Sequence, residues 1–184
     1  ALDTRGNPAY PANAIYASAG WNALNVRPNA GPGAGPTEDE RINRYTLDGR
    51  GYLRVFRQVV LAGRARYTTA DAPLPPYERW LLGGSDTLRG FRAGSFDGDE
   101  TFVTSAELRV PITDVTSGGK FGMTVFMDAA RAADHGARLQ DAEWQRGAGA
   151  GVFLIASVFR LNLDVARGLD GGKTRVHLSS GFSF

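Results

Sequence analysis

Residues 159–165 read FRLNLDV, and apolar and polar side chains alternate along them without interruption. The apolar side chains are those of Phe159, Leu161, Leu163 and Val165, and the polar ones are those of Arg160, Asn162 and Asp164. Successive side chains of a β-strand point to opposite faces, whereas a helix repeats every 3.6 residues. The segment therefore predicts a β-strand with one apolar face and one charged face.

The same period of two extends along the whole chain. We predict eight strands, at residues 14–24, 41–55, 58–67, 101–110, 121–129, 146–155, 159–165 and 174–184. One face of these strands is expected to carry Ile15, Trp21, Leu47, Leu61, Leu108, Val125, Leu161, Val165 and Phe182. The opposite face is expected to carry Arg44, Asp48, Arg54, Arg64, Glu107, Asp128, Arg160 and Asp164. A soluble β-sandwich would leave those charges in water, whereas a barrel directs them into a wet lumen where opposite signs pair.

This pattern predicts an all-β fold, namely an antiparallel transmembrane β-barrel of eight strands with its apolar face toward lipid. The connections support it, because long ones (25–40, 68–100 and 130–145) alternate with short ones (56–57 and 156–158), as is typical of outer-membrane barrels. Eight strands can close by themselves, but side chains then fill the interior. Two architectures remain open: a self-closed barrel, and half of a larger or dimeric barrel.

The bulk composition excludes several other classes of protein. No run approaches the ~20 apolar residues that a membrane-spanning helix needs. The chain has no cysteine, which excludes a disulfide framework and a cysteine-based metal site. Its 21 Lys and Arg residues against 19 Asp and Glu residues give a net charge of +2, too balanced to indicate a nucleic-acid partner. We expect a single domain over residues 1–184.

The sequence carries no arrangement that indicates catalysis. Of the two histidines, His135 falls in a predicted loop and His177 on the polar face of a predicted strand, far apart in the chain. No Ser, His and Asp set stands out, so we expect no enzymatic activity, no metal and no cofactor. The glycine-rich residues 147–151, GAGAG, are interpreted as small residues that let the strand bend or another backbone approach, and not as a nucleotide-binding loop.

The most informative motif is LGGSDTLRGF at residues 82–91, inside the longest predicted loop. Glycines at 83, 84 and 90 permit tight backbone turns, and Arg89 lies between two large hydrophobic residues. One interpretation is an ordinary surface loop with an exposed arginine. The other is a loop tucked against the strands, in which Arg89 reaches carboxylates of the lumen. The many apolar residues of the loop argue against free exposure.

This motif resembles the (V/L)RG(F/Y) loop of the BamA-like outer-membrane assembly factors, the bacterial surface antigen family that includes TamA and the two-partner-secretion transporters. Further similarities follow in the same order along the chain: LDTRGN at 2–7 with Pro11, AELRVP at 106–111, FMDAA at 126–130, RLNLDVA at 160–166, and the terminal GFSF. The resemblance covers the whole chain, but it corresponds only to the C-terminal eight-strand portion of the family's larger barrel, without the family's POTRA domains.

The resemblance implies roles for particular residues. It assigns Leu88, Arg89, Gly90 and Phe91 to the loop motif, Glu107 and Asp128 to its partners in the lumen, and Gly181, Phe182 and Phe184 to the seam and the C-terminal insertion signal. It implies a place in the bacterial outer membrane and assistance to the insertion or translocation of other proteins through a seam between the first and last strands. The implied partners are the lipid bilayer, client outer-membrane proteins and a second copy of this chain. The alternative is a passive small barrel, structural or adhesive, that keeps the motifs without the activity.

Overall fold

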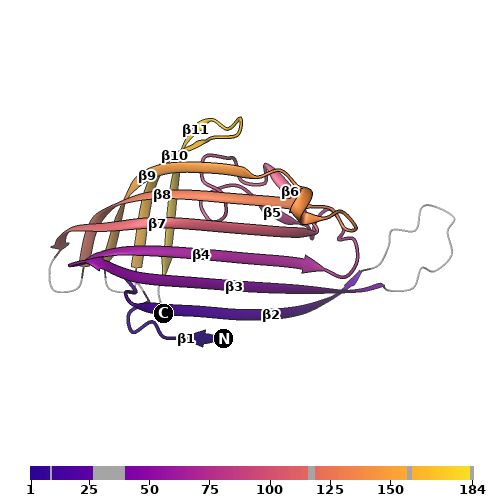
Figure 1. Cartoon of the computed structure of the whole chain (residues 1–184), viewed down its shortest axis with the longest axis horizontal. Helices are drawn as coiled ribbons and strands as arrows, with labels where there is room; N and C mark the ends of the chain where they lie inside the picture. The colour runs from indigo at the N-terminus through magenta and orange to yellow at the C-terminus, as the bar shows by residue number, and fades with distance from the viewer. Residues whose placement is uncertain (9, 27–39, 116–118, 157–158, 183–184) are drawn as a thin grey trace.

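The computed structural model describes residues 1–8, 10–26, 40–115, 119–156 and 159–182, and these residues form an all-β architecture (Figure 1). Nine strands make one antiparallel sheet in the order β1-β2-β3-β4-β7-β8-β9-β10-β11. Their bounds are β1 Leu2–Asp3, β2 Ala14–Val26, β3 Glu40–Phe56, β4 Val59–Ala70, β7 Glu100–Val115, β8 Gly119–Ala133, β9 Gln145–Ala156, β10 Phe159–Gly168 and β11 Thr174–Phe182. A separate two-stranded ribbon pairs β5 (Trp80–Leu82) with β6 (Phe96–Gly98), and η1 (Leu139–Asp141) is a short 3-10 turn.

All eight predicted segments form strands of the large sheet, but the predicted number of strands is wrong. The described residues contain eleven strands, and the three additional strands are β1, β5 and β6. These strands are two or three residues long, too short to show a period of two. No helix among the described residues has the length and apolar character needed to cross a membrane.

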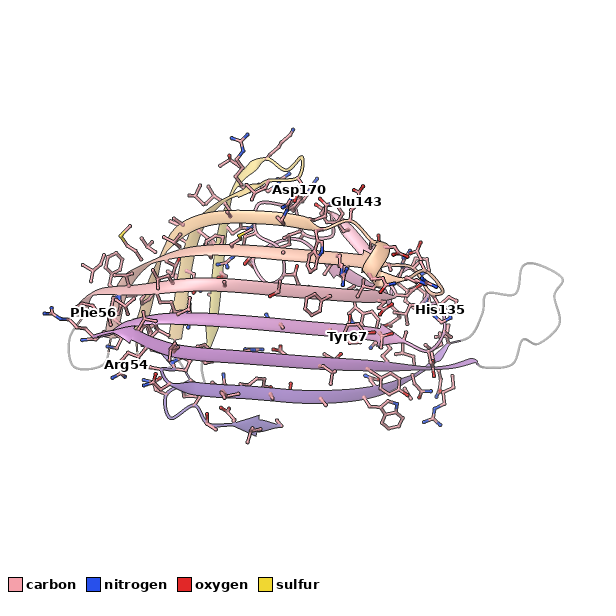
Figure 2. All side chains as sticks on the ribbon, in the orientation of Figure 1. Arg54, Phe56, Tyr67, His135, Glu143 and Asp170 are labelled. Carbon is pink, nitrogen blue, oxygen red and sulfur yellow. The ribbon has the colours of Figure 1, made fainter. Side chains whose placement is uncertain are left out.

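The two faces of the sheet are divided as the alternation predicts. The outer face exposes large apolar side chains, including Ile15 (59%), Trp21 (60%) and Val125 (60%). The inner face buries charged side chains, with Asp128 only 2% exposed. Arg54 lies on the inner face by register, opposite the buried Val60, but its side chain is exposed. It lies at the end of β3, beside a register irregularity between Arg54 and Phe56, where the sheet no longer covers it (Figure 2).

The sheet curls, and β10 and β11 run behind the front strands in Figure 1. Each long strand pairs with the next long strand along the chain, so that β4 pairs with β7. At one edge, β1 places Leu2 opposite Ala17 and Asp3 opposite Tyr16 of β2. Within the described ranges, no backbone pairing joins β11 to β1 or β2. Of the two architectures that the sequence leaves open, a self-closed barrel and half of a larger or dimeric barrel, the self-closed barrel is not seen in this part of the chain, where the strands form a curled open sheet.

Two segments enter the interior from opposite ends of the sheet. The first segment is residues 71–99, which carry the β5–β6 ribbon at one end of the sheet (Figure 1). The second is the N-terminal segment around Tyr10, at the other end, where the tight turn at residues 57–58 joins β3 to β4. Near this turn, Tyr10 is 8% exposed and packs with Val60, Phe153 and Ile155. Its hydroxyl donates to the carbonyl oxygen of Gln58 at 2.8 Å. The N-terminal segment therefore fills the interior at the end opposite the long loop.

Candidate functional site: a buried arginine loop

The connection between β5 and β6 is shaped by glycines in the left-handed region. Gly83, Gly84 and Gly90 have φ angles of 112°, 84° and 92°, which other residues rarely adopt. The Thr87 hydroxyl accepts from the Gly83 amide and donates to the Gly83 carbonyl oxygen, both at 2.8 Å. A bridge between Gly84 and Leu88 closes the turn. These bonds present the four residues 88–91 at the tip of the loop.

Two apolar residues anchor this tip to the inner face of the sheet. Leu88 is fully buried and Phe91 is 6% exposed. They share a core cluster with Leu82, Val103 and Ala130. The interpretation as an ordinary surface loop is therefore wrong, because the loop packs its large side chains against β7 and β8.

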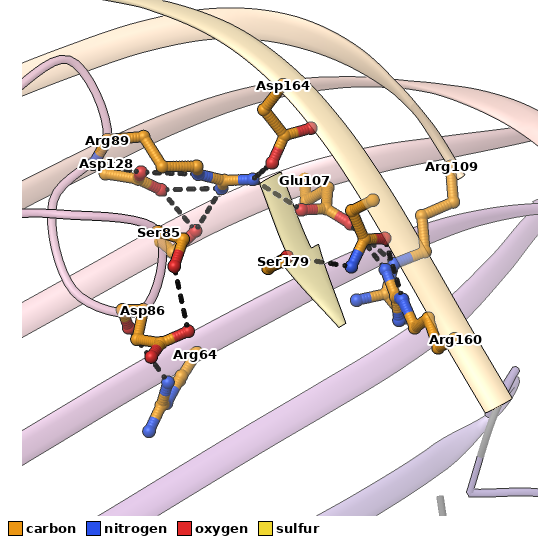
Figure 3. Close-up of polar contacts among 12 residues, drawn as sticks. Arg64, Ser85, Asp86, Arg89, Glu107, Arg109, Asp128, Arg160, Asp164 and Ser179 are labelled. Carbon is orange, nitrogen blue, oxygen red and sulfur yellow. Dashed lines mark hydrogen bonds and ion pairs between the residues drawn. The ribbon is translucent and has the colours of Figure 1, made fainter. Parts of the chain in front are cut away.

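Arg89 lies between these anchors in the chain and is 7% exposed. Figure 3 shows its side chain among the carboxylates of Asp128, Glu107 and Asp164. Its Nε and one terminal nitrogen donate to the two carboxylate oxygens of Asp128, each at 2.8 Å. The other terminal nitrogen donates to Glu107 at 3.1 Å and to Asp164 at 3.3 Å. Ser105 accepts a further bond at 3.3 Å. A guanidinium has five N–H donors, and each of these contacts occupies one of them.

The charges around Arg89 balance. Glu107 also accepts from Nε of Arg109 at 2.7 Å, and a nitrogen of Arg160 lies 3.6 Å from the same carboxylate. Three arginines thus face the three acids Glu107, Asp128 and Asp164. The Phe126 ring adds a cation–π contact, with its centroid 3.3 Å from Cζ of Arg89. Because buried charges must be paired and hydrogen-bonded, this arrangement makes burial of the arginine tolerable.

The predicted contacts of Arg89 with Glu107 and Asp128 are both present. Asp164 and Ser105 are further partners of Arg89 that the sequence pattern did not indicate. The alternation predicts that Asp164 lies on the polar face of its strand, but this residue is 75 residues from Arg89 in the chain, and no sequence motif connects the two. Its position on an inward face was the one available signal.

The glycine-rich string on β9 accommodates the loop. A Cβ atom built on Gly147 would collide with the carbonyl oxygen of Arg89. The same atom on Gly149 would collide with the Val165 carbonyl, and on Gly151 with the Asp164 carboxylate. The interpretation of these glycines as sites of close backbone approach is confirmed.

The loop tip also reaches the last two strands. The Gly90 amide donates to Nε2 of His177 on β11 at 3.0 Å. A Cβ atom on Gly90 would collide with the backbone of Arg167 and Gly168 at the end of β10. The ring of Phe91 lies against Gly168 as well. Residues 88–91 therefore touch every strand from β7 to β11.

The predicted seam residues lie elsewhere. Gly181 and Phe182 end β11, in register opposite Arg160 and Phe159, at the end of the strand away from the β10–β11 turn. Phe184 lies outside the described residues. A Cβ atom on Gly181 would meet open space, so its packing does not require glycine.

A polar cavity of about 290 Å³ adjoins the arginine cluster. Its lining includes Arg50, Arg64, Arg109, Arg160 and Asn162. In the part of the chain that the structure describes, no group of three or more His, Asp or Glu side chains could hold a metal ion. Away from this cavity, the exposed Arg146 at the start of β9 donates to the Asp170 carboxylate in the β10–β11 turn, which lowers the pKa of Asp170 below its usual range.

An antiparallel sheet with an apolar outer face, whose long loop buries an arginine on the charged inner face, defines the class of outer-membrane β-proteins with an inward-folded loop. The family comparison agrees with this class. Residues 1–184 match the model of the Omp85 superfamily domain, and the chain belongs to this superfamily. The resemblance found in the sequence is therefore confirmed. A search of curated proteins found no significant match.

Proposed function

We propose that this chain is an outer-membrane β-barrel protein that assists the insertion of other β-barrel proteins through the edges of strands β2 and β11. One observation carries the proposal. The loop motif holds β7 to β11 together as one block, whereas the outer edges of β2 and β11 have little or no strand partner among the described residues.

A membrane location is supported by the strands themselves. The eight long strands contain 9 to 17 residues, and a tilted transmembrane strand needs about 9–11. Their outer faces are apolar, as contact with lipid requires. Within lipid, backbone N–H and C=O groups need partners, so an edge strand there pairs with another strand.

The two edges are the places where such pairing is incomplete. Among the described residues, β1 pairs with β2 opposite Tyr16 and Ala17, Thr4 bonds the backbone of Ile15, and β11 pairs with β10 alone. The edges can pair with each other, with a second copy or with a client strand. An unpaired client strand that adds to either edge gains backbone hydrogen bonds with the N–H and C=O groups that this edge exposes. This exchange is the physical basis of the proposed assistance.

Insertion at an edge is favoured over translocation through the interior. The cavity beside Arg89 is about 290 Å³, and Tyr10 with its neighbours fills the opposite end of the interior. An extended polypeptide needs a continuous channel, and the side chains of the described residues occupy this path. A route along the wall needs no such channel.

Site-specific photo-crosslinking during client folding tests the proposal. A photoreactive amino acid is placed at Trp21 of β2, beyond the part of this edge that residues 2–4 cover, or at Leu178 of β11; these positions are 60% and 68% exposed on the outer face. Val125 of β8, which is 60% exposed in the middle of the sheet, is the matched control. The protein is reconstituted in lipid vesicles, and an unfolded barrel protein is added as client.

We expect crosslinks to the client at positions 21 and 178 well above those at 125, together with faster client folding than in empty vesicles. Equal crosslinking at the three positions and an unchanged folding rate would contradict the proposal. That outcome would favour the passive small barrel.

A further inference from the structure

His177 connects the loop motif to the last strand by a single hydrogen bond. It lies on the inner face of β11, where its Nε2 accepts from the Gly90 amide at 3.0 Å. A backbone amide is always a donor, so this bond exists only while Nε2 of the imidazole has a free lone pair. In a protonated imidazole both ring nitrogens carry hydrogen, and Nε2 would then present N–H to N–H.

We propose that His177 is a positioning residue whose protonation releases β11 from the loop motif. This inference deepens the proposed function, because it names what would regulate the edge of β11. The chain has two histidines and no cysteine. Histidine is the side chain that ordinarily changes charge between about pH 5 and 8, so the device would respond in that range.

The charged groups around His177 come from several elements. Asp164 is its cross-strand neighbour on β10, Asp128 faces it from β8, Arg89 from the loop and Arg175 from its own strand. Arg89 contacts Asp164 at 3.3 Å, longer than its contacts with Asp128 at 2.8 Å. A protonated His177 offers Asp164 a second cation, and so competes with Arg89 for that carboxylate. Protonation therefore weakens two links between the loop and the last hairpin.

The consequence concerns one edge of the sheet. β11 pairs with β10 and, in the described residues, has the loop as its other inner contact. Loss of this contact leaves β11 held, among the described residues, by its backbone ladder with β10 and by the bond that Asn162 Nδ2 donates to Ser179 Oγ at 3.2 Å. We therefore expect the β11 edge to open more often at low pH than at neutral pH, while β7 and β8 keep their contacts with Leu88 and Arg89.

Amide hydrogen exchange tests the inference without any client. The full chain in detergent micelles is followed at pH 5 and pH 8 by mass spectrometry, with each rate divided by its intrinsic value at that pH. Peptides that cover residues 83–95 and 174–182 are expected to exchange about fivefold faster at pH 5, the effect of losing one hydrogen bond of about 1 kcal/mol. Peptides of β7 are expected to change little.

Two variants of His177 separate the possible causes. His177→Ala should exchange fast at both pH values, because the acceptor is absent. His177→Gln should exchange slowly at both, because its side-chain oxygen accepts the Gly90 amide and does not titrate. His135→Ala is the control, because His135 is exposed and its contact with Asp99 is made by its backbone amide. It should keep the wild-type pH response.

Absence of a pH response in the wild-type protein would overturn the inference. A response that persists in His177→Gln would also overturn it, because it would then come from the acidic cluster. Failure of the proposed function is a separate result: the exchange pattern would stand, but the edge positions would not crosslink to a client.

Discussion

Removal of the Arg89 guanidinium tests whether the cluster stabilises the fold. In Arg89→Ala, Asp164 loses the ion-pair partner that the described residues provide, and Asp128 keeps only Ser105 and a backbone amide. Removing one partner of a buried ion pair costs about 3–5 kcal/mol. Two carboxylates are affected here, so we expect a loss near 5 kcal/mol in the free energy of unfolding. Arg89→Lys keeps the charge but loses the planar fork, and a loss of about 2 kcal/mol is expected.

The free energy is measured by urea unfolding in lipid vesicles, followed by tryptophan fluorescence. Arg146→Ala is the matched control: this side chain makes the same kind of paired contact with Asp170, but it is 51% exposed, and no measurable change is expected. Converting Asp128 and Asp164 to asparagine in the Arg89→Ala background should recover about 2–3 kcal/mol, because the uncompensated charges are then absent. A loss below about 1 kcal/mol in Arg89→Ala would refute the reasoning, since removal of one partner of a buried ion pair costs several kcal/mol.

Two further substitutions probe the inner and outer faces of the sheet by the same unfolding measurement. Gly147→Ala places a methyl group against the Arg89 carbonyl and should destabilise the protein by about 1–3 kcal/mol. Gly63→Ala meets open space and should be neutral; equal effects at the two glycines would contradict the packing described for the loop. Val125→Arg puts a charge on the outer face of β8 and should cost about 2–4 kcal/mol in vesicles, with Val125→Leu as control. A harmless Val125→Arg would mean that this face does not contact lipid.

The outer wall of the sheet was predictable because lipid and lumen impose opposite demands on neighbouring residues. Each strand must then alternate, and even β10, with Leu163 outward and Asp164 inward, shows its register from sequence alone. Two of the partners of Arg89 were predictable as well, with the help of the family resemblance. Glu107 and Asp128 lie on inward faces of the next two strands, and the loop motif supplied the link between them.

The interior was less predictable, because its contacts depend on how distant segments meet. Tyr10 fills one end of the interior by packing against Phe153, and no local pattern marks that pair. The β5–β6 ribbon is too short for a periodic signal. Arg54 has the correct alternation for an inward face, but it lies where β3 ends, and periodicity does not indicate where a sheet stops covering its own interior.

The partners of Arg89 have a further consequence for the order of folding. They lie 18, 39 and 75 residues away in the chain, at Glu107, Asp128 and Asp164. The first two become available once β7 and β8 are paired, whereas the third requires β10 to have joined the sheet. The contact with Asp164 closes the longest of the three loops and therefore carries the largest loop-closure cost. A sheet that lacks β10 would leave Arg89 without its third carboxylate, so the ion-pair cluster is complete only when the last hairpin has joined the sheet.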